Sequence, residues 1–123
     1  MNAERGDSLS ESRPLAPVHF PLAGARATPL QAGRLSALLL RHGSFELRYY
    51  APPGVDPQTP HTQDEVYVVA SGEGWFVRAG ERVRFAAGDA LFVAAGVEHR
   101  FEEFSDDFAT WVVFYGPQGG EQP

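Results

Sequence analysis

The sequence predicts one all-β domain, a small barrel built from short strands. Turns that contain Gly recur about every eight residues, which is typical of sandwiches and barrels. The runs between these turns are rich in β-branched and aromatic side chains, and no segment of helix length has the apolar period of a helix. The 123 residues, with 13 Gly and 10 Pro, suffice for a single core with many turns.

The first expected strands are residues 34–41 (RLSALLLR) and 44–50 (SFELRYY), joined at His42-Gly43, a pair suited to a hairpin turn. Residues 30–40 also fit a short helix, and the sequence leaves both interpretations open. Residues 51–60 (APPGVDPQTP) are too rich in Pro and Gly for regular structure and predict a loop. The strands expected after this loop are residues 65–70, 75–78, 82–85, 90–94, 99–104 and 108–115.

Both ends of the chain are expected to lie outside the barrel. Residues 1–17 are polar, charged and interrupted by Pro, which predicts a disordered or loosely packed segment. Residues 117–123 (PQGGEQP) predict a flexible tail for the same reason. The barrel is therefore expected to span residues 18–116.

The composition excludes several classes of function. A formal net charge of −6 argues against a nucleic-acid partner, which needs a basic surface. Without Cys the chain has no disulfide, no thiolate nucleophile and no Cys-ligated zinc, so His and carboxylates are the metal ligands left. No apolar run approaches the ~20 residues that span a bilayer, and the N-terminus lacks the apolar core of a signal peptide. We therefore expect a cytoplasmic protein with no membrane partner.

Three polar residues lead into one of the expected strands. His61, Gln63 and Glu65 occupy alternate positions. Because alternate side chains of a strand share one face, we expect all three to point inward with Tyr67, while Asp64 points away and is solvated. A polar cluster that faces the core is unfavourable unless it is paired or bound to metal.

His99 follows a turn that contains Gly on another expected strand, from which it can reach the same interior. Imidazole and carboxylate groups suit Fe, Mn, Ni, Co or Zn, and two His with one carboxylate suffice for non-haem iron. We therefore expect His61, Glu65 and His99 to hold a divalent metal ion, with Gln63 as a further candidate ligand. The competing interpretation is a metal-free pocket in which the histidines hydrogen-bond to Glu65.

Two stretches resemble the sequence motifs of the cupin family. HTQDEVYVVASG, from His61 to Gly72, is similar to the first motif, His-x-His with a following Glu and then Gly after six residues. GDALFVAAGVEH, from Gly88 to His99, is similar to the second motif, Gly, five residues, Pro-x-Gly, two residues and His, with Ala94 in place of the Pro. The resemblance covers residues 54–103 and implies a double-stranded β-helix, the cupin jelly-roll barrel, with its site inside the barrel mouth. The chain is most similar to small single-domain bacterial cupins.

The resemblance leaves one metal ligand open. Cupins usually ligate metal through three His and one Glu, and this sequence supplies two of those His. If the spacing to Glu65 sets the alignment, His61 is the second His and Thr59 replaces the first. If His61 is the first His, Gln63 replaces the second. Both alignments keep Glu65 and the same two histidines.

A metal with three protein ligands keeps open positions for water, dioxygen or substrate. The sequence therefore favours a metal-dependent oxygenase or isomerase that acts on a small organic molecule, with Glu65 as ligand or base. The alternative is a metal-free or non-catalytic module that binds a small molecule. The family further implies a homodimer, for which residues 108–115 (FATWVVFY) offer an apolar surface. The residues expected to line the pocket are Thr59, Tyr49, Tyr67 and Phe101.

Overall fold

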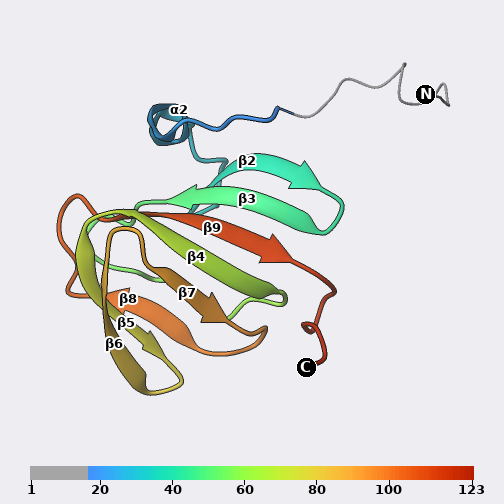
Figure 1. Ribbon diagram of the computed structural model, residues 1–123, viewed down its shortest axis with the longest axis vertical. Coiled ribbons are helices and arrows are strands. Elements are labelled where there is room, and N and C mark those ends of the chain that lie inside the picture. Colours follow the sequence, from blue (N-terminus) through green and yellow to red (C-terminus); the bar gives the residue numbers. More distant parts are fainter. Residues whose placement is uncertain (1–16) are drawn as a thin grey trace, which may run out of the picture.

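The computed structural model describes residues 17–123, which form two antiparallel β-sheets preceded by a short helix (Figure 1). Residues 1–16, which make up almost all of the segment predicted to be loosely packed, lie outside the described residues. The prediction of an all-β domain is confirmed. In chain order the elements are α2 (Leu22–Ala27), β2 (Ala37–His42), β3 (Phe45–Tyr50), β4 (Asp64–Ser71), β5 (Glu73–Arg78), β6 (Glu81–Ala86), β7 (Ala90–Val93), β8 (His99–Glu102) and β9 (Ala109–Tyr115).

The two sheets combine local hairpins with long-range pairings. The larger sheet has the strand order β2-β3-β9-β4-β7, and the smaller has the order β6-β5-β8. The β2–β3 and β5–β6 pairs are hairpins, whereas β9 returns from the end of the chain to lie between β3 and β4. In Figure 1 the smaller sheet lies across from β4 and β7. The space between the sheets is therefore where inward-pointing side chains from distant parts of the chain meet.

The core between the sheets is largely aromatic. On β4, Tyr67 and Val69 are buried, whereas Val68 between them is 40% exposed, as alternation on a strand requires. Phe76 and Phe101, from the smaller sheet, meet the Tyr67 ring edge to face, with ring centroids 5.7 and 4.9 Å away. This packing sets the position of β4 relative to the smaller sheet.

The turn after β4 requires Gly72. Its φ is +86°, and a Cβ at this position would lie 2.6 Å from the Cα of Phe108. A residue with a side chain would be strained in its backbone and would collide with its neighbour. The close approach fixes the end of β4 against the start of β9.

The N-terminal part of the described chain differs from the sequence-based expectation. Helix α2 has six residues, and its buried Ala25 packs with Tyr49 and Ala109. A helix this short shows no usable period in sequence, and its stability comes from packing. Residues 30–40, which fitted either a helix or a strand, form a turn and the start of β2. No helix in residues 17–123 is long and apolar enough to cross a membrane.

The C-terminal residues, expected to form a flexible tail, are held against the segment that precedes β4. The Gly119 N–H donates to the Thr62 carbonyl at 2.6 Å, and the Glu121 N–H donates to Asp64 Oδ2 at 2.9 Å. The Ala95 N–H donates to Asp64 Oδ1, also at 2.9 Å. Asp64 is 4% exposed, so the expectation that it is solvated is wrong. The two backbone N–H groups also hold the pKa of its carboxyl below the usual value.

Strand β9, which the sequence suggested as a dimer surface, is the middle strand of the larger sheet. Its residues Val112 and Phe114 are buried in the core, and Trp111 packs on the opposite face against Tyr49. The homodimer stays a prediction.

Candidate metal centre

Glu65 supplies the acidic group at the middle of the candidate centre. It is the second residue of β4, paired with Val93 on β7 and Phe114 on β9, and its side chain is 2% exposed. Pairing on both sides fixes its backbone within the larger sheet. Its Oε1 is buried and has no hydrogen-bond partner among the described residues. A buried carboxylate oxygen in this state is unfavourable, and a cation beside it would relieve the cost.

His99 approaches Glu65 from the other sheet. It is the first residue of β8, its side chain is fully buried, and its Nε2 lies 3.2 Å from Glu65 Oε1. This contact is an ion-pair contact, since it lacks the geometry of a hydrogen bond. The Nδ1 of His99 lies 2.9 Å from the carbonyl oxygen of Val97, which can only accept, so Nδ1 carries a hydrogen and donates it. This hydrogen bond orients the ring so that Nε2 faces the carboxylate.

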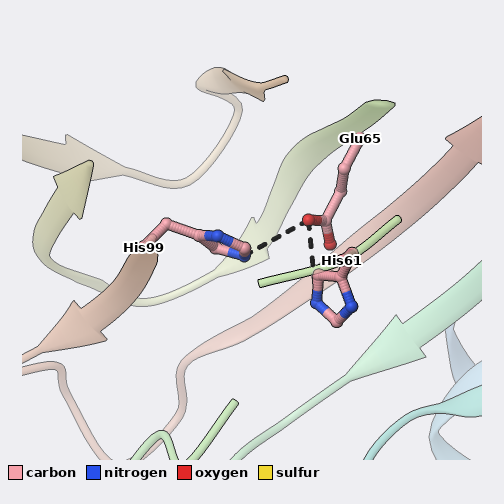
Figure 2. A group of neighbouring side chains, drawn as sticks. All are labelled: His61, Glu65 and His99. Atoms are coloured by element: carbon pink, nitrogen blue, oxygen red, sulfur yellow. Dashed lines mark ion pairs between the residues drawn. The ribbon is translucent and has the colours of Figure 1, made fainter. Parts of the chain in front are cut away.

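His61 completes the cluster from the segment that leads into β4. Its side chain is 31% exposed, and its Nε2 lies 3.8 Å from Glu65 Oε1. The edge-on contact with Phe114, with ring centroids 4.9 Å apart, holds the imidazole against the barrel wall. Figure 2 shows that both histidines face the same oxygen of Glu65. The three ligand atoms lie within 4.8 Å of one another.

Gln63, the fourth ligand candidate, is turned away from this cluster. Its amide nitrogen donates to the carbonyls of Ser44 and Gly116, at 3.0 Å each. The alternation expected across residues 61–65 does not extend that far, because β4 begins only at Asp64 and the chain bends before it. The expectation that Gln63 shares a face with Glu65 is therefore not met.

Gln58, which the sequence analysis did not single out, takes a place beside the cluster. Its Oε1 lies 3.1 Å from His61 Nε2 and 3.1 Å from the Tyr67 hydroxyl. Its Nε2 donates to Asp56 Oδ2 at 2.7 Å, which fixes which end of the amide faces the site. The residue lies in the Pro-rich loop before β4, where no strand pattern indicates a direction.

Asp56 holds this loop in place through hydrogen bonds. The buried carboxylate accepts hydrogen bonds from the Tyr50 hydroxyl, from the Phe101 N–H at 2.8 Å, and from both the backbone and the side chain of Gln58. Four donors on one carboxylate set the position of Gln58, and through it the positions of His61 and Tyr67.

The hydrogen bonds of the metal-free cluster fit two protonation states of His99. The Tyr67 hydroxyl lies 3.1 Å from the Gln58 amide oxygen and 3.0 Å from His99 Nε2, and it has one hydrogen to donate. If it donates to Gln58, His99 Nε2 donates to the Tyr67 oxygen, and with Nδ1 donating to Val97 the imidazole carries a positive charge beside Glu65. If it donates to His99, the ring is neutral and the Gln58 oxygen accepts from His61. A bound metal ion would require the neutral ring.

The pKa directions agree with this pattern. Burial lowers the pKa of His61, although the Glu65 carboxylate opposes the shift. Burial acts the same way on His99, but its contacts with Glu65 and the Val97 carbonyl outweigh burial and raise its pKa. Burial, with nearby Glu65, raises the pKa of Tyr67 well above that of a free phenol, so Tyr67 stays a hydrogen-bond donor.

The spacing of the three donor atoms fits a metal ion with modest adjustment. With bonds of about 2.1 Å, adjacent ligand atoms are about 3.0 Å apart at right angles and about 3.4 Å apart in a tetrahedron. Glu65 Oε1 and His99 Nε2 already have such a spacing at 3.2 Å, and His61 Nε2 is 3.8 Å from the same oxygen. His61, the most exposed of the three, is therefore the side chain that would move inward.

A small cavity of about 40 Å³ adjoins the cluster, with room for a few water-sized groups. Of the residues expected to line it, Tyr67 does so. Tyr49 points to the opposite face of β3 and packs on Trp111, and its neighbour Tyr50 lines the cavity instead. Phe101 lies in the aromatic core, and Thr59 is exposed outside the cavity lining.

Comparison with known proteins agrees with this architecture. Residues 47–115 match the protein family described as "Cupin domain". The chain belongs to the cupin family. Its two antiparallel sheets are the jelly-roll β fold of cupins, as the motif resemblance implied.

Among its relatives, this cupin is 43% identical over 81 residues to an uncharacterized protein of Streptomyces coelicolor, an alignment that covers 64% of this chain and 77% of the relative. A Cupin 2 conserved barrel domain protein from Salinispora arenicola has a similar structure, with a TM-score of 0.57, 24% identity, and coverage of 72% of this chain and 86% of that chain. A predicted oxalate decarboxylase from Thermotoga maritima has a TM-score of 0.51 and 28% identity, with coverage of 63% and 76%.

This cupin has neither of the two proposed substitutes for the usual third His beside its cluster. Thr59 is exposed, and Gln63 is bound to backbone carbonyls. The side chain that does reach the cluster is Gln58, whose amide oxygen lies on the His61 side. The cupin therefore has a His/Glu cluster able to hold a metal ion, with an amide oxygen next to it.

Proposed function

We propose that this cupin binds a divalent transition-metal ion through His61, Glu65 and His99 and uses it to transform a small organic molecule. The observation that carries this proposal is Glu65 Oε1, a buried carboxylate oxygen without a hydrogen bond, faced by two imidazole nitrogens. Two neutral imidazoles and one carboxylate are a suitable ligand set for Fe, Mn, Ni, Co or Zn.

A bound ion would supply Lewis acidity and open coordination positions for oxygenation or isomerisation chemistry. The protein contributes orientation: the Val97 carbonyl holds the tautomer of His99 that leaves Nε2 free for a ligand role. The Tyr67 hydroxyl and the Gln58 amide oxygen, both in the cavity wall, offer a donor and an acceptor to a substrate. The size of the cavity favours a small substrate, and the Thermotoga neighbour, described as a predicted oxalate decarboxylase, supports the same expectation.

The second candidate function is a metal-free module that binds a small molecule. It is favoured by one observation: the hydrogen bonds among Gln58, Tyr67 and His99 are complete when His99 is protonated and no metal is present. In that case the positive His99 and the negative Glu65 compensate each other.

Elemental analysis of the purified protein separates the two functions. Near-stoichiometric transition metal is expected, and His61→Ala and His99→Ala are expected to lose it because each removes one of three protein ligands. His42→Ala is the matched control, since this exposed His ends β2 outside the cluster, and it should retain the metal. Folding of each variant is checked by circular dichroism. Absence of metal after incubation with Fe, Mn, Co, Ni and Zn salts would leave the metal-free module.

A further inference from the structure

A buried guanidinium lies close to the candidate metal centre. Arg48, on β3, is completely buried. Its Nε donates to Glu46 Oε1 at 2.7 Å, and its NH1 donates to the Ser36 carbonyl at 3.1 Å. Its NH2 is buried and finds no hydrogen-bond partner among the described residues. An arginine presents a planar fork of donors, and leaving part of that fork unsatisfied in the interior is unfavourable.

The register of the larger sheet places Arg48 beside two residues of the cavity wall. Arg48 pairs with Val112 on β9, and Val112 pairs in turn with Tyr67 on β4. Val112 and Tyr67 both line the cavity beside Glu65, and so does Ser36, which contacts Arg48 directly. Ser36 lies in the bend before β2 and is not held in a strand. Arg48 itself is absent from the cavity lining, so its NH2 reaches a ligand there only when this bend moves aside.

A second cavity, of about 190 Å³, is also lined by His61. Its lining is mainly polar and includes the exposed Arg34 and the carboxylate of Glu46. Glu46 is already bound by two arginines, since Arg41 NH2 lies 2.7 Å from Oε2 while Arg48 holds Oε1. Arg34 therefore adds a positive charge that Glu46 is not available to compensate. The two cavities share His61 and Phe114 in their linings, so they are neighbours.

The charges around the two cavities favour an anion. The ionisable groups that line or contact them, apart from the histidines and the neutral tyrosines, are Arg34, Arg41, Arg48, Glu46, Asp56 and Glu65. The three arginines balance the three carboxylates, so the proposed divalent ion would leave two positive charges. The whole chain, in contrast, has a net charge of −6, so the positive character is local to the site.

We propose that the substrate of this site is a small organic carboxylate, drawn in by Arg34 and bound at its carboxylate group by the free NH2 of Arg48. A carboxylate matches the arginine fork, and such charge-assisted hydrogen bonds are stronger than neutral ones. The wall formed by Val112, Phe114 and Tyr67 suits the carbon part of the ligand. The inference deepens the proposed function and depends on it only through the charge of the metal ion.

The test uses the full chain loaded with Co²⁺, whose visible spectrum reports on ligands near the ion, titrated with malonate and with its neutral diamide, malonamide. Malonate is expected to bind about tenfold more tightly than malonamide, because the amide cannot form the charge-assisted hydrogen bonds. Arg34→Gln and Arg48→Lys should each weaken malonate about fivefold while leaving Co²⁺ affinity unchanged. The matched control is Arg84→Gln, an exposed arginine paired with Glu73 on the smaller sheet, which should bind malonate as the wild type does.

Equal affinity for malonate and malonamide, or unchanged malonate binding in both Arg34→Gln and Arg48→Lys, would overturn the inference. Tighter binding of inorganic phosphate than of malonate would overturn the organic class. If Arg48→Lys melts at a much lower temperature than the wild type, Arg34→Gln carries the test, because Arg34 is exposed. Failure to bind Co²⁺ would reject the proposed function alone. Malonate is then titrated calorimetrically into the metal-free wild type and Arg34→Gln proteins. Weaker binding by Arg34→Gln supports the inference, and equal binding overturns it.

Discussion

Replacing Asp56 by Asn should destabilise the protein more than any surface substitution, although the side chain hardly changes shape. Asp56 is 7% exposed. Oδ1 accepts from the Tyr50 hydroxyl and the Gln58 N–H, and Oδ2 accepts from the Gln58 side chain and the Phe101 N–H. Asn offers one acceptor and one donor group, so in either orientation its NH2 faces two donors.

The magnitude follows from the orientation that loses least. If the Asn oxygen takes the place of Oδ2, it keeps the Phe101 N–H, which is fixed in β8 and has no other acceptor to turn to. The Tyr50 hydroxyl can then rotate and accept from the new NH2, while the Gln58 N–H loses its partner. Losing one charge-assisted hydrogen bond and leaving one donor poorly satisfied costs about 2–4 kcal/mol of unfolding free energy.

Urea denaturation followed by tryptophan fluorescence measures this difference. The control is Asp106→Asn, an exposed position, which should lie within about 0.5 kcal/mol of the wild type. An Asp56→Asn protein as stable as that control would refute the reasoning, because it would mean that the four hydrogen bonds at Asp56 contribute nothing that an amide cannot replace.

Three further predictions concern the site and the segment that precedes β4. Gly120→Ala should lower metal affinity, measured by calorimetric titration, because its Cβ would lie 2.8 Å from Asp64 Oδ1 and push the C-terminal residues off Asp64, next to Glu65. Gly119→Ala is the control for backbone strain, since Gly119 has a similar positive φ but no neighbour within 4 Å of the added Cβ. Metal affinity should fall as the pH falls through the raised pKa of His99, because the proton competes with the ion, and an unchanged affinity from pH 8 to about 5.5 would contradict this. The pKa of Asp64 is lowered in the folded protein, so its ionised form stabilises the fold above the unfolded pKa, near 3.8, and this stabilisation is lost as the pH falls through the folded pKa. Below pH 4 the urea midpoint should therefore fall more steeply with pH in the wild type than in Asp64→Asn.

Most of the strands could be predicted because their turns and periods are local features of the sequence. Alternation marks residues 82–85, and the structure has β6 from Glu81 to Ala86. Helix α2 could not be found in this way: it has six residues, no side-chain cap, and packing partners such as Tyr49 and Ala109 that come from distant strands. The sequence of this segment has no local signal, such as a cap or an apolar period, strong enough to define the helix.

In the candidate site too, residues within strands could be predicted and residues outside them could not. Glu65 and His99 lie within strands, where alternation gives a direction, and the structure brings them together. Gln63 lies one residue before its strand begins, so alternation gave it the wrong direction. Gln58 is positioned by tertiary contacts with Asp56, and no pattern within its loop reveals them.

The adjacent residues Tyr49 and Tyr50 show a further limit of prediction from sequence. Both are aromatic, so a strand pattern cannot tell which one faces inward. Burial does not separate them either, because Tyr49 is covered by α2 and Tyr50 by the core. The face is decided by the register of β3 against β9, which is a property of the assembled sheet.

The contacts between the two sheets are apolar at one end of the barrel and polar at the other. At one end Phe76, Phe85, Phe101 and Phe108 pack against one another in an apolar cluster, and separating them would expose a large hydrocarbon surface to water. At the other end the sheets meet through His99 and Glu65, ionisable groups that regain hydration when they part. Fluctuations that open the barrel should therefore begin at the polar end, and amide hydrogens at the start of β8 should exchange faster than those of β5. The end expected to open first is then also the end at which the cavity beside Glu65 lies.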